Sequence, residues 1–392
     1  MKKIVFTQEF CQPENMFPFS LTRKVQDIRI GILTIRQKWE LLLDMPSYDK
    51  GEEDYKDSSA TLNINEAIGK DIIYLVHGNL LPTPKLLQQV KKLKPGEILT
   101  QPGRESIVYC ISKNEIIDQH KINVKKSIDY DHELKEFMYP WDMVKLNAWA
   151  IEQDFEFLRK FVKGQRIPSS NKTINAPGIF IEKGASVEHC YLNASEGPIY
   201  IAKGALIMEG TSIRGPVSIG SGATVKMGAR IYGATTIGPG CIVGGEIKNS
   251  IFFANSNKAH DGYLGDSVVG EWCNFGAGTS CSNIKNTASP VMVWTQNGPI
   301  DAGLKCGVMI GDYSRTAINT SINTGSVIGV CAHVFGTGLT PKYIPSFSWG
   351  SDGIERYVFD KALQDIAAWK SLKKENTTDR EKFILKHIFD HY

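Results

Sequence analysis

The most regular feature of the chain is an aliphatic residue at every sixth position through much of its second half. The unbroken series consists of Ile201, Ile207, Ile213, Ile219, Val225, Ile231, Ile237 and Val243. A strand alternates with period two, and a helix places every sixth residue on drifting faces, so neither element alone produces this period. The pattern therefore predicts a repeat architecture.

A second column of mostly small residues follows four positions after each aliphatic one, with glycines at the corners between them. Its members are Ala205, Thr211, Val217, Ala223, Ala229, Thr235, Cys241 and Ile247. Three short strands joined by tight turns use about eighteen residues per coil and stack their aliphatic side chains inward. The small residues fit the crowded corners. The two columns are a hexapeptide repeat and predict a parallel β-helix.

The period breaks twice, and both breaks hold polar side chains. From Val243 to Tyr263, where the inward column is expected to resume, the spacing is two residues longer than a full coil. From Cys281 to Ile310 it is five residues longer than four hexads. Loops that project from a rigid repeat are common places for chemistry.

The segments SNKAHDGYLGDS and NFGAGTSCSN carry a more specific pattern. His260 stands three residues before Tyr263, and Asn274, Ala277 and Asn283 follow. Over about residues 175 to 340 the chain resembles the hexapeptide acyltransferases. These two segments resemble the acetyltransferase domain of the bifunctional glucosamine-1-phosphate acetyltransferase and N-acetylglucosamine-1-phosphate uridyltransferase. The resemblance implies a left-handed β-helix that assembles as a homotrimer.

The resemblance also implies roles for individual residues. His260 would be the general base that takes a proton from an amine attacking a thioester, and imidazole, which titrates near pH 6.5, suits that task. Asn283 would orient the amine or the thioester carbonyl. Arg230 and Lys248 would bind a sugar phosphate through fixed positive charge. Tyr263, which also occupies an inward register position, and Asn274 would hydrogen-bond sugar hydroxyls.

The family binds acetyl-CoA along a groove between subunits. The implied contacts in this chain are Ala277, Asn283, Ile284, Ile318 and Gly336. One family lysine is absent, because Ser289 stands in its place, and Lys285 or Lys305 is the expected replacement. The tail from Cys306 to Gly329 is more similar to the archaeal form of these enzymes.

The front of the chain shows an α/β pattern. DIIYLVHGN reads as a buried strand, and the residues after it as a turn and a helix that begins near Thr83 and Pro84. The segment from Pro18 to Trp39 resembles short sugar nucleotidyltransferase-like domains joined to hexapeptide repeats. Within that segment, Arg23 and Lys24 are either phosphate contacts or surface charges.

Full nucleotidyltransferases have a glycine-rich loop after the first strand and a metal-binding aspartate after a later one. This chain has TQEFCQPEN and His77-Gly78-Asn79 in those places. Without an amide cradle or a carboxylate, Mg²⁺-assisted nucleotidyl transfer has little support, and Mg²⁺ is expected only if this domain is active. A domain that binds a sugar nucleotide, or that only packs, is the competing interpretation.

Apolar residues three or four positions apart predict two amphipathic helices, one from Trp141 to Leu158 and one from Phe359 to Trp369. Four segments are therefore expected. They are a reduced nucleotidyltransferase-like α/β domain over residues 1–140, a connecting helix over 141–170, the β-helix over 171–345 and a C-terminal helical segment over 346–392.

Composition narrows the choice of partners and location. A net charge of +3, with 22% charged residues, gives no reason to expect nucleic acid or a membrane surface. The start MKKIVFTQEF has too short an apolar run for a signal peptide, and no stretch approaches a membrane span. The eight cysteines contain no CxxC pair, which suits reduced thiols in the cytoplasm and disfavours a cysteine zinc site.

The leading hypothesis is an acetyl-CoA-dependent N-acetyltransferase acting on an amino-sugar 1-phosphate, with glucosamine 1-phosphate preferred and residual sugar-1-phosphate nucleotidyl transfer left open. The alternative is a non-catalytic trimeric protein that binds a sugar nucleotide or regulates. The same coil also forms stalks, and it forms carbonic anhydrases when three histidines bind zinc, two of them five residues apart. Within the coil only His189, His260 and His333 are available, so no metal site is expected.

Overall fold

The computed structural model describes residues 2–8, 11–51, 61–62, 71–118 and 121–392. The chain forms two compact units whose segments alternate along the sequence. The first unit contains Met1–Pro13, Lys24–Ile28 and Leu33–Met138, and the second contains Glu14–Arg23, Arg29–Ile32 and Tyr139–Tyr392. Two short pieces of the expected front domain therefore group with the later part of the chain.

The first unit is built on a mixed sheet with the strand order β12-β8-β9-β6-β1-β4-β5. Its strands are β1 (Lys2–Thr7), β4 (Ser47–Lys50), β5 (Thr61–Leu62), β6 (Ile72–His77), β8 (Glu97–Gln101), β9 (Arg104–Ile111) and β12 (Lys126–Asp129). β1 pairs in parallel with β4 and β6, whereas β9 runs antiparallel to β6 and β8. Ile4, Val5 and Leu75 are buried at the centre of this sheet. The predicted α/β character is confirmed.

Helices α1 (Ile35–Leu43) and α3 (Pro84–Val90) belong to the same unit. The Thr83 hydroxyl accepts a hydrogen bond from the Leu86 N–H at 3.1 Å, and Pro84 fills the first turn, so α3 begins where the sequence predicted. The Trp39 indole of α1 donates to the Leu80 carbonyl at 2.8 Å. The smaller strands are β3 (Leu33–Thr34), β7 (Leu80–Leu81), β10 (Ile116–Asp118), β11 (Lys121–Ile122) and β13 (Lys135–Glu136).

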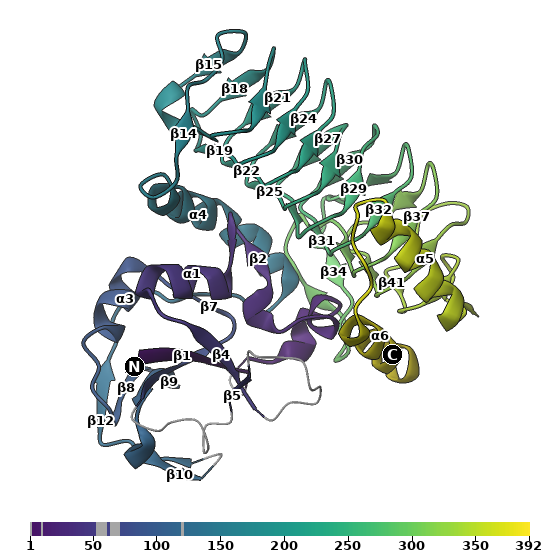
Figure 1. Ribbon diagram of the computed structural model, residues 1–392. Helices are drawn as coiled ribbons and strands as arrows, with labels where there is room; N and C mark the ends of the chain where they lie inside the picture. The colour runs from purple at the N-terminus through teal and green to yellow at the C-terminus, as the bar shows by residue number, and fades with distance from the viewer. Residues whose placement is uncertain (1, 9–10, 52–60, 63–70, 119–120) are drawn as a thin grey trace. The chain divides into compact units, whose positions relative to one another are not determined.

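The second unit is a coil of three sheets that share one interior, with successive strands stacked as Figure 1 shows. Sheet I contains β14 (Gly164–Gln165), β16 (Ile179–Glu182), β19 (Ile199–Ile201), β22 (Val217–Ile219), β25 (Thr235–Ile237), β28 (Ile251–Phe252), β31 (Val268–Val269), β36 (Met309–Ile310), β39 (Val327–Ile328) and β41 (Tyr343–Ile344). Sheet II contains β15 (Lys172–Ile174), β18 (Tyr191–Asn193), β21 (Ser212–Arg214), β24 (Arg230–Tyr232), β27 (Glu246–Lys248) and β30 (Tyr263–Gly265). Sheet III contains β17 (Ser186–Val187), β20 (Leu206–Ile207), β23 (Thr224–Val225), β26 (Ile242–Val243), β29 (Asn257–Lys258), β32 (Asn274–Phe275), β37 (Arg315–Thr316), β40 (His333–Val334), β42 (Ser348–Trp349) and β43 (Glu355–Arg356).

The predicted inward columns are confirmed. All eight aliphatic residues from Ile201 to Val243 are at most 2% exposed. The parallel register places Ile231 directly above Ile213, and Ile237 above Ile219. Each buried Ile or Val contributes roughly 1.5 to 3 kcal/mol, so the coils are stable as a stack. The second unit is therefore the parallel β-helix that the repeat indicated.

The first break is a change in coil length, and it corrects one prediction. Eighteen residues separate Val243 from Val225 beneath it, but only fifteen separate Lys258 from Val243. Because the corners are shorter here, counting in hexads loses the register. Leu264 pairs with Ile247 and is 1% exposed, so the expectation that Tyr263 points inward is wrong.

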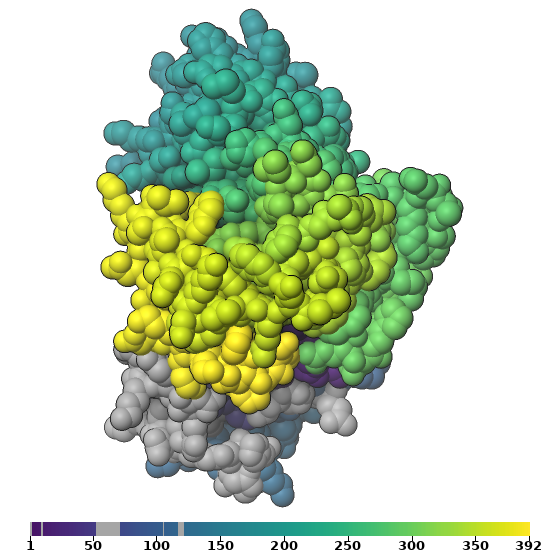
Figure 2. All heavy atoms as spheres, turned by 90° about the vertical axis from the view of Figure 1, so that its right-hand side faces the viewer, coloured from purple at the N-terminus to yellow at the C-terminus, as the bar shows by residue number. Residues whose placement is uncertain are grey.

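The second break is an excursion from the coil that contains a small hairpin. It lies between β33 (Ser280–Cys281), which pairs with β38 (Ser321–Ile322), and β36. The hairpin strands β34 (Met292–Val293) and β35 (Ile300–Asp301) pair antiparallel. This part of the second unit is green in Figure 2, beside the later coils.

Three helices complete the second unit. α4 (Pro140–Leu158) is fixed to the coil by Asn147, whose Nδ2 donates to the Ala234 carbonyl at 2.7 Å. The same side chain binds the end of β2 (Arg29–Ile30), because Asn147 Oδ1 accepts a hydrogen bond from the Gly31 N–H at 2.7 Å. α5 (Phe359–Ser371) confirms the predicted C-terminal stripe, and α6 (Asp379–His391) follows it over the later coils, yellow in Figure 2. Short 3-10 turns occupy Pro13–Met16, Phe19–Leu21, Val25–Asp27, Lys113–Glu115 and Ala176–Gly178. In the described part of the chain, no helix is long and apolar enough to cross a lipid bilayer.

Candidate active site

Sheet II presents a polar outer face where β24, β27 and β30 lie side by side. Arg230, Glu246 and Tyr263 occupy one row of the register, and Tyr232 and Lys248 belong to a second row two residues further along each strand. Neighbouring strands are about 4.8 Å apart, so side chains of one row are within contact distance. The fold thus gathers residues that are up to thirty-three positions apart in the sequence.

Glu246 connects the two predicted phosphate ligands. Arg230 Nε lies 3.5 Å from Glu246 Oε2, and the Tyr232 hydroxyl donates to Glu246 Oε1 at 2.7 Å. That hydrogen bond raises the pKa of Tyr232. The Lys248 ammonium lies 5.5 Å from the centroid of the Tyr232 ring. Arg230 and Lys248 are therefore brought together around two residues that sequence reasoning missed, although Glu246 and Lys248 flank the inward Ile247 as a visible outward pair.

His260 lies at the edge where sheets III and II meet, in the turn between β29 and β30. Its side chain is exposed. No residue of the described ranges hydrogen-bonds to its imidazole, whereas the surrounding backbone is well anchored. The Asp261 carbonyl accepts from the Gly278 N–H at 3.1 Å, and the His260 carbonyl accepts from Lys258 Nζ at 2.7 Å. The ring is open to a ligand while its turn is held.

Asn283 lies at the opposite end of sheet II, above the corner that follows β30. Its Nδ2 donates to Asp266 Oδ2, while Asn249 Nδ2 donates to Asp266 Oδ1 at 3.2 Å. An ionised carboxylate only accepts hydrogen bonds, so the amide oxygen of Asn283 is turned away from Asp266. Asp266, the last residue of the HDGYLGD segment, is thus an orienting residue that the sequence reasoning did not single out.

Tyr263 and Asn274 lie on different faces of the coil. Tyr263 is half-buried on the outer face of sheet II, where burial and the nearby Asp266 carboxylate raise its pKa. Asn274 belongs to β32 of sheet III, between Asn257 and Arg315 in the register. A single chain therefore places Tyr263 in the same row as Arg230, with Glu246 between them, but leaves Asn274 on the neighbouring face.

Ala277 and Ile318 follow one corner of the coil upward from the His260 turn. The Gly278 N–H donates to the Asp261 carbonyl, and one coil higher the Asn319 N–H donates to the Ala277 carbonyl at 2.7 Å. Ile318 is 70% exposed, which is unusual for isoleucine in a folded chain. The corner above His260 therefore carries an uncovered apolar surface.

Gly336 and Ile284 have less direct relations to that corner. The register of Thr316 with Val334 places Gly336 one coil above Ile318. Ile284 follows Asn283 at the start of the excursion and is 42% exposed. Gly336 therefore continues the corner of Ala277 and Ile318, whereas Ile284 lies at the far end of sheet II.

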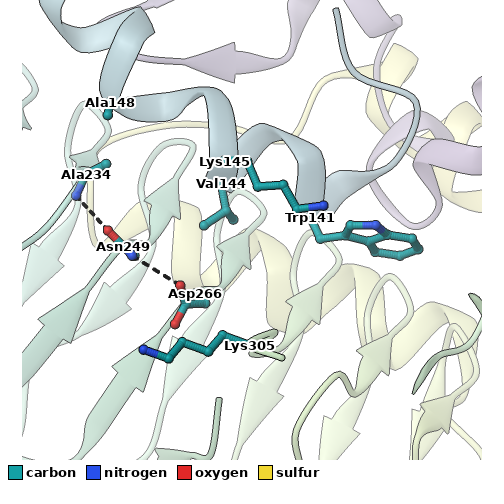
Figure 3. A pocket seen from close by; sticks show the side chains of 8 residues that line it. All are labelled: Trp141, Val144, Lys145, Ala148, Ala234, Asn249, Asp266 and Lys305. Carbon is teal, nitrogen blue, oxygen red and sulfur yellow. Dashed lines mark hydrogen bonds between the residues drawn. The ribbon is translucent and has the colours of Figure 1, made fainter. Parts of the chain in front are cut away.

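A pocket of about 270 Å³ lies between α4 and the corners of the coil (Figure 3). Its lining residues are Trp141, Val144, Lys145, Ala148, Ala234, Asn249, Asp266 and Lys305. Figure 3 shows Lys145 entering from α4 and Lys305 lying beside Asp266. The Asp266 carboxylate that orients Asn283 also lines this pocket, so the pocket adjoins the end of the sheet II face that lies opposite His260.

The two lysines proposed for the missing family lysine differ in their surroundings. Lys285 Nζ donates to the Pro290 carbonyl at 2.6 Å, within its own loop. Lys305 is exposed and lines the pocket next to Asp266. Lys305 is therefore the better placed of the two to meet an anionic group.

In the first unit, the residues at the expected metal position do not fit Mg²⁺. His77 Nδ1 contacts Arg104 Nη2 at 2.7 Å, and burial together with the Arg104 charge lowers the pKa of His77 to about 3. The Asn79 amide donates to the Phe137 carbonyl at 2.9 Å. Mg²⁺ prefers carboxylate and water oxygens, whereas this place offers an imidazole facing an arginine. Among the described residues, no three metal-ligating side chains gather.

The segment expected to form the triphosphate loop is described only in part, because residues 9 and 10 of TQEFCQPEN lie outside the described ranges. Arg23, further along, is not a solvated surface charge. Its guanidinium forms an ion pair with Asp312 inside the second unit, and it lies 4.9 Å from the centroid of the Phe253 ring. Lys24 is exposed.

The chain joins an α/β unit to a parallel β-helix, and comparisons with known proteins relate it to transferases. Residues 4–162 match the family described as sugar nucleotidyl transferase. The chain is 30% identical over 225 residues to the bifunctional sugar-1-phosphate nucleotidylyltransferase/acetyltransferase of Sulfurisphaera tokodaii, covering 57% of this chain and 49% of that protein.

Two bifunctional GlmU proteins also match. The protein of Methanococcus maripaludis strain S2 is 40% identical over 84 residues, which is 21% of this chain and 20% of the relative. That of Wigglesworthia glossinidia brevipalpis is 32% identical over 133 residues, 34% of this chain and 23% of the relative. The matches support the predicted GlmU-like relationship and a transferase. They span between about a fifth and about half of the relatives' lengths.

Proposed function

We propose that this chain is an acetyl-CoA-dependent N-acetyltransferase acting on an amino-sugar 1-phosphate, with glucosamine 1-phosphate as the preferred acceptor. The observation that carries this proposal is the shared outer face of sheet II. Arg230, Lys248 and Tyr263 lie there on adjacent strands, with His260 at the edge. The relative from Sulfurisphaera tokodaii, which matches over more than half of this chain, is named as a sugar-1-phosphate nucleotidylyltransferase/acetyltransferase and supports this class of reaction.

The cationic groups of this face suit a phosphate monoester. The Arg230 guanidinium offers two parallel donors, and Lys248 adds a second positive charge on the next strand. Glu246 lies against Arg230 at 3.5 Å, so an arriving phosphate competes with this carboxylate for the guanidinium. Lys305, beside Asp266, is our candidate for the cation that replaces the family lysine absent at Ser289.

Acetyl transfer needs one proton to be moved. As the amine nitrogen forms a bond to the thioester carbonyl carbon, the His260 imidazole accepts a proton from that nitrogen. The carbon–sulfur bond then breaks, and the departing thiolate of coenzyme A takes the proton. Ala277 and Ile318, on the corner above His260, provide a surface along which coenzyme A can lie. Asn283, with its amide oxygen directed away from Asp266, accepts a hydrogen bond from the bound ligand.

We further propose that the site is completed between chains of a homotrimer. Asn274 lies on sheet III, whereas Arg230, Lys248 and Tyr263 lie on sheet II of the same chain. A three-fold arrangement brings sheet III of one chain toward sheet II of the next, so that Asn274 and the exposed Ile318 meet the sugar-binding face of a neighbour. This supports a cleft built from two chains.

For the first unit we propose sugar-nucleotide binding or packing without Mg²⁺-dependent chemistry. The imidazole of His77 and the amide of Asn79 replace the expected carboxylate and have partners within the unit. A cytoplasmic location fits the cysteines, since none of the eight is in a disulfide bond and all have buried side chains.

The test is the release of free thiol from acetyl-CoA in the presence of glucosamine 1-phosphate. His260→Ala is expected to lower kcat by at least about a hundredfold, because general-base catalysis typically contributes that much. His189→Asn is the matched control, since His189 is another exposed corner histidine of the coil and its φ of +57° is tolerated by asparagine.

An undiminished rate in His260→Ala removes this histidine from the mechanism. No turnover by the intact protein with glucosamine 1-phosphate or galactosamine 1-phosphate contradicts the acetyltransferase and favours the non-catalytic sugar-nucleotide-binding alternative. Binding of a UDP-sugar by calorimetry then distinguishes that alternative from a stalk.

A further inference from the structure

One lysine lies inside the coil, in a column that is otherwise mostly aliphatic or aromatic. The sheet III register stacks Lys258 on Val243, which itself stacks on Val225. The next coil places Phe275 above Lys258, because Asn257 pairs with Asn274. Lys258 is 2% exposed. It is therefore a core residue by position and a cation by type.

The ammonium group of Lys258 connects the same corner in two successive coils. Nζ donates to the carbonyl of His260 at 2.7 Å and to the carbonyl of Gly244 at 3.3 Å. Gly244 in turn donates its N–H to the Lys258 carbonyl at 2.7 Å. Both contacts are to main-chain oxygens, so they fix backbone positions rather than side chains. One of those positions is that of the candidate base.

This arrangement is costly if it serves packing alone. An ammonium removed from water needs compensating partners, whereas an aliphatic residue in the same column needs none. The burial lowers the pKa of Lys258 to about 8, against the opposing effect of the Asp261 carboxylate. Val225 and Val243 show that the column accepts valine. The lysine thus has a use that valine does not supply.

That use is suggested by the shape of the His260 turn. Gly262 has a φ of +121° and approaches the Thr279 carbonyl so closely that a Cβ would lie 2.1 Å from its oxygen. The turn from residue 259 to 262 is therefore irregular, and its His260 carbonyl points into the coil toward Lys258. A donor beneath it is needed to hold that carbonyl in place of water.

We propose that Lys258 is a positioning residue that holds the His260 turn in the geometry required for acetyl transfer, through its hydrogen bonds to the carbonyls of His260 and Gly244. This inference rests on the proposed acetyltransferase function. Lys258 does not touch the ligand and is not a proton carrier. It acts through the backbone of His260, which is the residue that accepts the proton.

The experiment replaces Lys258 with methionine, which has similar length and no donor. In the intact protein, Lys258→Met is expected to lower kcat for glucosamine 1-phosphate by about ten- to a hundredfold, the loss typical of a slightly misplaced catalytic group. KM is expected to change by less than about twofold, because Arg230 and Lys248 remain in place. Hydrogen exchange of the Glu246 and Gly278 amides, which donate to the Gly262 and Asp261 carbonyls of this turn, is expected to become faster.

Val225→Ala is the matched control, two coils below in the same column. It creates a cavity in the core and should lower the melting temperature while leaving kcat and exchange of the Glu246 and Gly278 amides unchanged. Lys258→Leu serves as a second neutral variant should the methionine variant not fold. If Lys258 only packs the core, its variants should leave kcat and hydrogen exchange of the turn unchanged, as Val225→Ala does.

Unchanged kcat together with unchanged exchange in the Lys258 variants overturns the inference. If the intact protein shows no acetyl transfer at all, the proposed function fails, and exchange then decides the positioning separately. Faster exchange confined to the Glu246 and Gly278 amides supports the proposal that Lys258 holds the turn in place, and unaltered exchange of these two amides contradicts it.

Discussion

The buried ammonium of Lys258 also makes the stability of the second unit depend on pH. The folded protein releases this proton near pH 8, whereas the unfolded chain releases it near 10.5. Between these values the unfolded state binds more protons, so the free energy of unfolding rises with pH across this window. Below pH 8 the buried Lys258 stays protonated, and the full cost of this to the free energy of unfolding, about 3 kcal/mol for a pKa shift of this size, is present.

Lys258→Met removes this penalty. We expect the free energy of unfolding of the variant, taken relative to that of the wild-type protein, to be about 3 kcal/mol more favourable at pH 7 than above pH 10.5, because only the wild-type protein gains stability as Lys258 loses its proton. Urea unfolding monitored by fluorescence at several pH values measures it. The difference between the two proteins isolates Lys258, because buried thiols such as Cys241, whose pKa burial raises to about 12, titrate equally in both. A stability difference that is constant with pH contradicts the lowered pKa.

At the residue scale, the sequence predicts side-chain direction only where the period holds. Ile201 to Val243 follow strict hexads, and all eight point inward. Tyr263 was misplaced because two shortened corners intervene, from Val243 to Ile247 and from Ile247 to Phe252, and corner length depends on backbone turns that leave little trace in composition. Glu246 and Asp266 were missed because their roles depend on neighbours in other coils, Arg230 and Asn283, rather than on nearby sequence.

At the scale of elements, the segment Glu14–Arg23 is held by the packing of Phe17 and Phe19 against other rings and by a buried ion pair at its end. The Arg23 and Asp312 side chains are 10% and 4% exposed, and they lie 289 positions apart in the sequence. Removing one partner leaves a buried charge without compensation, which typically costs about 3 to 5 kcal/mol. We expect Arg23→Met to lower the stability of the second unit by this amount, measured by urea unfolding.

The double variant Arg23→Met with Asp312→Leu should lose less than Arg23→Met alone, because the more buried of the two carboxylates that face Arg23 is then removed, and the other, Glu271, is 37% exposed. Lys382→Met is the control, since Lys382 pairs with Asp379 at 2.9 Å on an exposed helix face and should change stability by less than about 0.5 kcal/mol. Equal losses in Arg23→Met and Lys382→Met would mean that the ion pair contributes no more than a surface contact.

Helices with a clear start signal and stripe were predictable, whereas placements between distant segments were not. α3 has its Thr83 cap, and α4 and α5 have apolar residues three and four apart. α6 has an equally local signal, since Thr378 and Glu381 form a capping box, and the sequence reasoning overlooked it. The docking of Arg23 on Asp312 has no local signal, because the pattern around Arg23 is compatible with any surface.

At the scale of the whole molecule, the two units illustrate two kinds of sequence information. The coil repeats one physical rule many times, so its fold follows from the period alone. The first unit has no repeat, and its relation to sugar nucleotidyl transferases appears through a match over residues 4–162 rather than through an intact set of ligands. Because His77 and Asn79 stand in place of the expected carboxylate, we propose that such a unit keeps the fold without the metal chemistry.

Assembly and activity are expected to be lost together if the site is shared between chains. Ile318 is 70% exposed on the corner above His260, where a neighbouring chain would cover it. A charge in that place would have to lose its water on association, which opposes assembly. We therefore expect Ile318→Asp to convert a trimer into smaller species in light scattering and to abolish acetyl transfer.

Leu372→Asp, at an equally exposed apolar residue after α5, should change neither the assembly nor the rate of acetyl transfer. A monomeric Ile318→Asp that keeps full activity would show that one chain holds the complete site, and that Asn274 on sheet III takes no part in it.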